Sequence, residues 1–187
     1  MPSLVRIPND SATETRNALD AGATGLLVPH ATRAEQTQRI VELARFGEGG
    51  GGLAGSTRAA CFTTRSMFEH LEFSEKETTN ALQIEDLAAL NNVDAIAGVE
   101  SVYGLFIGRA DLVVAMQHGV NDAAVLAAVK GICQACDELN LAVGMFTADA
   151  SEVPMWMACG ASFLPFGSDH AFLLNGAKAL KQTISPD

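Results

Sequence analysis

The sequence is short of basic residues, and this argues against a role on nucleic acids. It has 12 Lys and Arg against 22 Asp and Glu, a formal net charge of −10 at pH 7. No basic run is longer than a pair. A nucleic-acid groove needs concentrated positive charge to neutralise phosphates. The composition therefore excludes that class of partner.

Long apolar runs are missing as well. No stretch approaches the ~20 apolar residues of a membrane-spanning helix, and the first residues lack the regions of a signal peptide. We therefore expect a cytoplasmic protein with no membrane partner. At 187 residues, 48% of them hydrophobic, the chain can form one domain over residues 1–187 with a sizeable core.

Cysteines are few, and the four present do not suggest a disulfide framework. Cys133 and Cys136 form a CxxC, a spacing found in zinc and redox sites. No second CxxC or spaced histidine pair completes a zinc site. Both thiols fall in a stripe of apolar residues with helical spacing, which favours buried helical thiols.

What the chain does have is six short apolar runs separated by helical segments. They are residues 4–7, 25–29, 81–85, 104–108, 142–146 and 162–167. This alternation predicts a parallel sheet with right-handed crossovers. A closed (β/α)₈ barrel needs eight βα units. The count of six alone is therefore equally compatible with an open doubly wound sheet.

Several polar residues mark the expected ends of helices. Ser11 with Glu14 and Thr32 with Glu35 are capping boxes, Asn121 and Ser168 are N-caps, Asn140 is a left-handed stop, and one helix is expected over 86–97.

Residues 47–52 hold five glycines and predict a loop. Phosphate-binding glycine motifs are absent there. A mobile loop beside an active site is favoured, with a plain surface loop as a close alternative.

Two carboxylates follow neighbouring runs. Glu85 closes the third run and Asp111 lies just past the fourth. Residues directly after parallel strands meet at the carboxyl edge of the sheet, where ligands bind. Two carboxylates there suit a hard divalent cation such as Mg²⁺ or Mn²⁺. The structural alternative is that they cap the following helices, a role that Asp86 could take after the third run.

Other polar residues are expected near the same edge. His30 and His170 follow the second and sixth runs, so each is either a general base or a simple rim or capping residue. Arg58 and Arg109 are candidates for binding an anionic substrate tail, with exposed surface positions as the alternative. Trp156 and Met155 are expected to pack against the sheet.

Several motifs occur together in the order and spacing of one family. They are Arg6, Leu-Leu-Val-Pro at 26–29, Leu-Gln-Ile-Glu at 82–85, Phe-Ile-Gly-Arg-Ala-Asp-Leu at 106–112, Gly-Met-Phe at 144–146 and Gly-Ser-Asp-His at 167–170. Over nearly its whole length the chain resembles the HpcH/HpaI aldolase/citrate lyase family, the metal-dependent class II pyruvate aldolases that include 2,4-dihydroxyhept-2-ene-1,7-dioic acid aldolase.

The resemblance implies an α/β fold of the (β/α)₈ TIM-barrel type, of which this chain holds about six βα units and lacks the N-terminal two. It also implies a homo-oligomer, from a dimer to a hexamer, with the last helix exchanged between neighbours. The family's histidine base lies in the lacking portion, so the identity of the base is open.

The site residues that the resemblance implies are Arg6 and Asp20 for catalysis, Arg6, Gln83 and Ala110 for substrate binding, and Glu85 and Asp111 as metal ligands. The implied cofactor is a divalent metal, Mg²⁺ or Mn²⁺, with Co²⁺ as a further option. Asp20 matches an aspartate that pairs with the catalytic histidine, often across a subunit boundary.

The implied reaction cleaves 2-keto-4-hydroxy acids to pyruvate and an aldehyde through a metal-stabilised enolate. No lysine follows a run at the rim, which disfavours a Schiff-base aldolase. Two alternatives remain. One is a catalytically impaired member or fragment acting as a structural or regulatory subunit, and the other is an open flavodoxin-like binding module.

Overall fold

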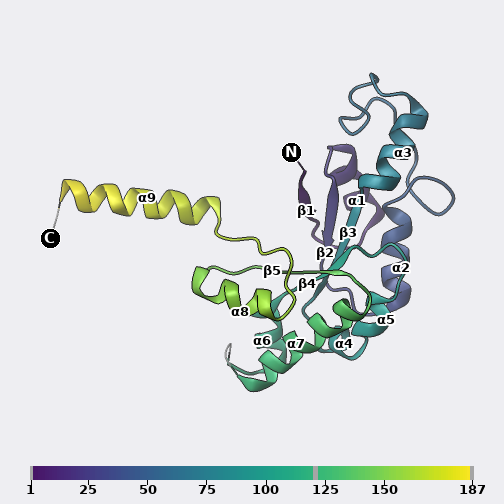
Figure 1. Ribbon diagram of the computed structural model, residues 1–187. Helices are drawn as coiled ribbons and strands as arrows, with labels where there is room; N and C mark the ends of the chain where they lie inside the picture. Colours follow the sequence, from purple (N-terminus) through teal and green to yellow (C-terminus); the bar gives the residue numbers. More distant parts are fainter. Residues whose placement is uncertain (1, 120–121, 186–187) are drawn as a thin grey trace.

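The fold is built on one parallel sheet, seen in a computed structural model that describes residues 2–119 and 122–185 (Figure 1). Its strands are β1 (Leu4–Arg6), β2 (Gly25–Val28), β3 (Thr79–Ile84), β4 (Gly104–Ile107) and β5 (Ala142–Met145). They lie in the order β1-β2-β3-β4-β5, and each pair is parallel. A doubly wound sheet reverses its order at a switch point. This unbroken order is that of a barrel segment, so the flavodoxin-like alternative is wrong.

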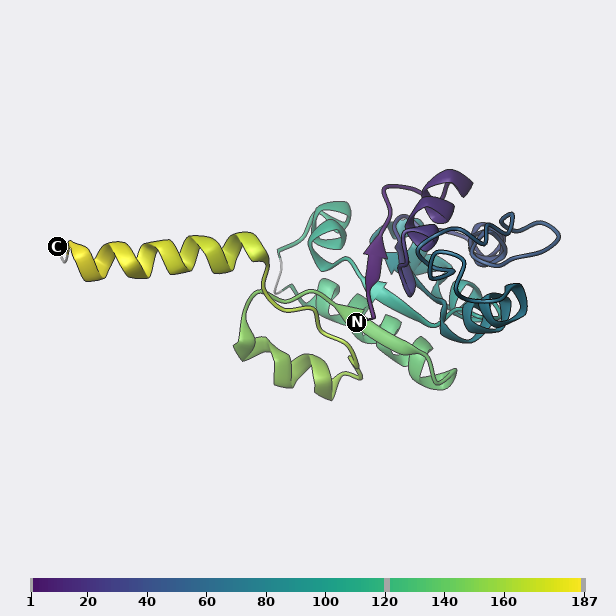
Figure 2. The same ribbon diagram turned by 90° about the horizontal axis from the view of Figure 1, so that it is seen from above.

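Helices fill the connections. They are α1 (Ala12–Asp20), α2 (Ala34–Leu43), α3 (Met67–Glu77), α4 (Leu87–Asn91), α5 (Val93–Ala97), α6 (Arg109–Met116), α7 (Ala123–Glu138), the 3₁₀ helix η1 (Ala150–Glu152), α8 (Val153–Ala158) and α9 (Asp169–Ile184). Figure 2 shows the helical layer from above, with α9 standing apart from it.

The two faces of the sheet have different environments. Alternate strand residues, among them Leu82, Ile84 and Leu105, pack in the main core with residues from α2, α5, α7 and α8. The opposite face carries a small cluster in which Phe163 packs on Leu27, Ala81 and Phe106. Because side chains alternate along a strand, Gln83 and Glu85 lie on the same side of the sheet as Ala81 of this cluster.

The sixth apolar run does not form a full strand. Residues 162–167 reach β5 only through two isolated parallel bridges, Gly144 with Phe163 and Thr147 with Phe166. Pro165 interrupts the run, and proline has no N–H to donate to a ladder. Gly144 leaves room here, since a Cβ on it would lie 2.1 Å from the Phe163 ring.

Two of the predicted helix caps are confirmed. The Ser11 hydroxyl accepts from the N–H of Glu14, and the Ser168 hydroxyl accepts from the N–H of Ala171. The predicted left-handed stop at Asn140 is also confirmed, with φ of 55°.

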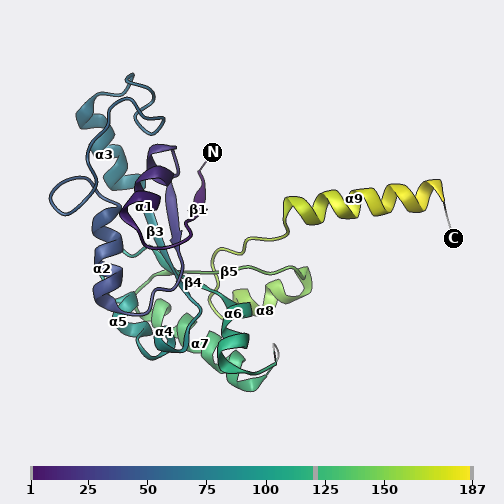
Figure 3. The same ribbon diagram turned by 180° about the vertical axis from the view of Figure 1, so that it is seen from behind.

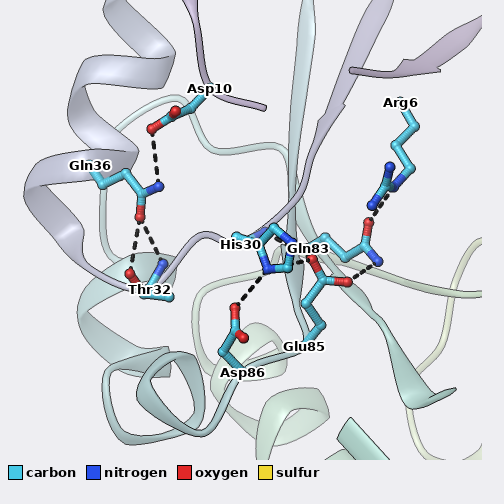
Figure 4. A network of polar contacts seen from close by, with 8 residues as sticks. All are labelled: Arg6, Asp10, His30, Thr32, Gln36, Gln83, Glu85 and Asp86. Atoms are coloured by element: carbon cyan, nitrogen blue, oxygen red, sulfur yellow. Dashed lines mark hydrogen bonds and ion pairs between the residues drawn. The ribbon is translucent and has the colours of Figure 1, made fainter. Parts of the chain in front are cut away.

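The prediction of a capping box formed by Thr32 and Glu35 is wrong. The Thr32 N–H and hydroxyl contact the Gln36 side chain, and α2 begins after Arg33 without a side-chain cap (Figure 4). Asn121 lies outside the described residues, and Asp122 is the N-cap of α7.

The single helix expected over 86–97 is divided into α4 and α5 at Asn92. The Asn92 side chain donates to the carbonyls of Thr32 and Ala88, both at 2.9 Å. Asp86 occupies the N-cap position of α4 but makes no side-chain cap hydrogen bond. Its carboxylate instead contacts the His30 ring. The alternative expectation, that Asp86 caps this helix, is therefore wrong.

The glycine-rich loop lies at the amino edge of the sheet. Gly47 lines a cavity of about 590 Å³ together with Thr79 at the start of β3 and Tyr103 just before β4. The carboxyl ends of the strands are at the other edge. The expectation of a loop beside the active site is therefore wrong within this chain.

The CxxC is part of the packing of α7, as predicted. Cys133 and Cys136 are buried in the main core, and burial raises the pKa of each thiol to about 11. Trp156 on α8 is 2% exposed in the same core, whereas Met155 is 44% exposed, contrary to expectation.

The last helix, α9, projects away from the body (Figures 1 and 3). Its large apolar side chains are all more than half exposed; they are Phe172, Leu173, Leu174, Leu180 and Ile184. Within residues 2–119 and 122–185, no helix combines the length and apolarity needed to cross a membrane.

Candidate active site at the carboxyl edge

Glu85 is the buried centre of the carboxyl edge. It directly follows β3 and is 2% exposed. Strand alternation places it on the same face as Gln83. Gly108, after β4, lies against it: a Cβ there would be 2.7 Å from the Cβ of Glu85. The fold thus encloses this carboxylate between the ends of neighbouring strands.

A chain of hydrogen bonds connects Glu85 to β1 and β2 (Figure 4). The backbone N–H of His30 donates to Glu85 Oε1 at 3.0 Å. The Gln83 amide donates to Glu85 Oε2. Arg6 Nε in turn donates to Gln83 Oε1 at 3.1 Å. Three predicted site residues, Arg6, Gln83 and Glu85, are therefore brought together.

His30 adopts a conformation that serves this network. Its φ of 55° is left-handed, an uncommon state for a residue other than glycine. Its Nδ1 lies 3.0 Å from Asp86 Oδ2 and 3.2 Å from Glu85 Oε1. The hydrogen bond with Asp86 is the main reason that the pKa of His30 is raised above its usual value.

The pKa of Glu85 is also raised. Burial is the main cause, and the charge of Asp111 acts in the same direction, while the His30 N–H and the charges of His30 and Arg6 oppose it. A carboxylate that is buried near a second negative charge is destabilised in its ionised form. A bound cation would relieve this cost, so the residues present fit the divalent metal that the family resemblance implies.

Asp111 and Ala110 lie in the first turn of α6. Both are exposed, and Gly108, in contact with Glu85, is the N-cap of this helix. Backbone N–H groups in a first helical turn have no intrahelical acceptor. The turn therefore offers N–H donors without an intrahelical acceptor, and Asp111 is near enough for its charge to contribute to the raised pKa of Glu85.

The set of three metal-ligating side chains found in the described part of the chain includes the predicted ligand Glu85 but not the predicted ligand Asp111. Ligand atoms of His30, Glu85 and Asp86 lie within 4.8 Å of one another. His30 and Asp86 were not predicted as ligands. The signal for them was nevertheless present, since each follows a strand as Glu85 does.

Other predicted residues lie apart from this network. Asp20 ends α1 at the amino edge, where its carboxylate is 4.0 Å from Arg16 Nη1. His170 is on α9, with its ring paired to Asp169. The Arg58 side chain packs near Gly22, just beyond α1. Any role of Asp20 at a carboxyl-edge site would require a second copy of the chain.

The arrangement defines a class of protein. A barrel-type parallel sheet presents a guanidinium, an amide, an imidazole and several carboxylates at its carboxyl edge. Such a set can bind an oxygen-rich anion and a divalent cation together.

Known proteins agree with this description. The family model for "HpcH/HpaI aldolase/citrate lyase" matches residues 2–176. A hydroxypyruvate/pyruvate aldolase of Pseudomonas aeruginosa is 32% identical over 181 residues, 96% of this chain and 67% of the relative. A 4-hydroxy-2-oxo-heptane-1,7-dioate aldolase of Klebsiella pneumoniae is 31% identical, covering 95% of this chain and 68% of its own length.

Solved structures give the same result. A family member from Burkholderia cenocepacia superimposes with a TM-score of 0.89 at 28% identity, over 97% of this chain and 73% of that one. The chain belongs to the HpcH/HpaI aldolase/citrate lyase family, and it is a carbon–carbon lyase by this relationship.

Proposed function

We propose that this chain cleaves 2-keto-4-hydroxy acids to pyruvate and an aldehyde. The observation that carries the proposal is the linked set Arg6–Gln83–Glu85 at the carboxyl edge. Relatives named as pyruvate and 4-hydroxy-2-oxo acid aldolases support the substrate class. Cleavage leaves negative charge on the keto oxygen of the pyruvate portion, and the site is rich in groups that counter it.

In this proposal Arg6 contacts the keto oxygen, and Gln83 fixes its guanidinium through the 3.1 Å hydrogen bond. The N–H of Ala110, in the first turn of α6, binds the substrate carboxylate. Glu85 and Asp111 hold a divalent cation, Mg²⁺, Mn²⁺ or Co²⁺. When bound, the cation supplies Lewis-acid stabilisation of the negative charge.

We assign the removal of the 4-hydroxyl proton to His30. Its ring lies beside Glu85, and Asp86 holds it through Nδ1 at 3.0 Å. His30→Gln should abolish aldol cleavage while oxaloacetate decarboxylation remains, because decarboxylation has no hydroxyl proton to remove. Equal losses of both activities would contradict this assignment.

The central test is metal-dependent release of pyruvate from oxaloacetate. With Mn²⁺, the purified chain should release pyruvate faster than free Mn²⁺ does. Addition of EDTA or the substitution Glu85→Ala should abolish this excess rate. Glu72→Ala, which removes an exposed carboxylate of α3, is the matched control and should leave the rate unchanged. No rate above free Mn²⁺ would overturn the proposal.

We also propose that the chain forms a homo-oligomer. Leu4 and Val5 on the edge strand β1 are 41% and 37% exposed, and the apolar side of α9 has no cover in one chain. Exposed strand edges and apolar helix faces favour association. Light scattering after gel filtration should give a mass of at least two chains.

A further inference from the structure

A largely buried ion pair connects α6 to the segment that follows β5. Arg109 Nη2 lies 2.8 Å from Glu152 Oε2, and the two side chains are only 17% and 23% exposed. Arg109 is the first residue of α6, and Glu152 is the last residue of η1. The pair joins positions 43 residues apart.

The same carboxylate oxygen has further donors. Thr147 Oγ1 donates to Glu152 Oε2 at 3.1 Å and Trp156 Nε1 donates at 3.3 Å. The Arg109 guanidinium also lies over the Trp156 ring, 5.1 Å from its centre. Because Trp156 is fixed in the core, the ion pair is anchored to a rigid part of the fold.

Arg109 depends on this partner. Its Nη1 is buried and finds no hydrogen-bond partner among the residues that the structure describes. A buried cation that loses its counter-charge is strongly destabilised. The side chain is therefore held at Glu152 and is not free to bind a substrate tail, contrary to the expectation from sequence.

The anchored residue is next to the proposed site. Ala110 and Asp111 directly follow Arg109 in the first turn of α6, and Gly108 before it touches Glu85. Within the described chain, no side chain caps the start of this helix. The Arg109–Glu152 ion pair is thus a side-chain contact that can hold the start of this helix in place.

We infer that Arg109 and Glu152 are positioning residues that hold the first turn of α6 in register with Glu85. The consequence for activity rests on the proposed function: the pair would align the Ala110 N–H and the Asp111 carboxylate with the metal site. Neither residue touches substrate or metal in this role.

The test uses three variants of the full chain. Glu152→Gln removes the counter-charge, and the double variant Arg109→Met/Glu152→Leu removes both charges. Replacing a buried ion pair by apolar residues is often neutral for stability, so the double variant should fold. Glu72→Gln on the exposed face of α3 is the control with the same charge change as Glu152→Gln.

The first readout is Mn²⁺ binding followed by electron paramagnetic resonance. Loss of a residue that orients a metal ligand typically weakens metal affinity by 10–100-fold, and we expect losses on the order of tenfold in Glu152→Gln and in the double variant. The KM for oxaloacetate should rise more than kcat falls. Wild-type Mn²⁺ affinity in a folded double variant would overturn the inference.

The second readout is hydrogen exchange of the Leu112 amide, whose 2.9 Å hydrogen bond to the carbonyl of Gly108 closes the first turn of α6. Both variants should exchange faster there than the wild type, while the control does not. This readout needs no metal, so it stays decisive if the wild type fails to bind Mn²⁺ and the proposed function falls. Unchanged exchange in both variants would overturn the inference independently.

Discussion

The backbone N–H of His30 donates to Glu85 Oε1 at 3.0 Å, which ties the second residue after β2 to the first residue after β3. This contact holds a buried carboxylate in one orientation without using a charged partner. It survives replacement of the carboxylate by an amide, whose oxygen also accepts a hydrogen bond. Charge and orientation at residue 85 can therefore be separated by experiment.

Glu85→Gln should remove metal binding and preserve the fold. Because burial raises the pKa of Glu85, the neutral amide avoids the cost of a buried charge. The amide NH2 would, however, face the NH2 of Gln83, which donates to Glu85 Oε2 in the wild type, so one hydrogen bond of the network is lost. Thermal unfolding in EDTA should therefore show a Tm close to that of the wild type, while Mn²⁺ binding is lost. A Tm far below the wild-type value would show that the charge itself stabilises the empty site, contrary to this account.

Arg6→Lys should impair catalysis with little effect on stability. Lysine lacks the planar fork that contacts Gln83 and the proposed keto oxygen together. We expect kcat/KM for oxaloacetate to fall about 10²-fold. Arg6 is exposed on an edge strand, so the free energy of unfolding should change by no more than about 0.5 kcal/mol. Arg39→Lys on the exposed side of α2 is the control, and an equal loss there would refute a specific role.

Acid should weaken the Arg109–Glu152 contact. The hydrogen bond from Arg109 is the main cause that lowers the pKa of Glu152. A carboxyl whose folded pKa is depressed stabilises the fold above its unfolded pKa, about 4.3, and loses this effect as the pH falls through the folded value. Urea unfolding at pH 7 should show Glu152→Gln less stable by about 2 kcal/mol, with a smaller difference at pH 3. A difference that does not shrink would contradict the ionic origin.

The apolar stripe of α9 should mediate assembly. Leu173, Ala177, Leu180 and Ile184 recur at helical spacing along one side of this helix. Leu173→Glu should lower the mass measured by light scattering, because a charge in an apolar contact is costly. Gln182→Glu adds the same charge away from the stripe and should leave the mass unchanged. Identical masses for both variants would exclude the stripe as the contact.

The sequence determined the parts of this protein that depend on local pattern. Apolar runs alternating with helical segments specified a parallel α/β fold, and Glu85 was found because a residue that ends a buried run must lie at the edge of the sheet. The helix ends at Ser11, Asn140 and Ser168 were also local, since each cap bonds or bends backbone within a few residues. The family motifs added the barrel type, which the strand count could not give.

Only the tertiary structure decided which polar groups meet. Asp86 was one candidate for a helix cap by sequence, yet its carboxylate contacts His30, 56 residues away. Arg109 was a candidate for a substrate tail and is instead held by Glu152. The sixth run does not form a full strand, because its pairing depends on a distant partner and Pro165 has no N–H to donate. The energy of a charged or ladder-forming group is set by the neighbours that folding brings to it, and sequence spacing does not specify them.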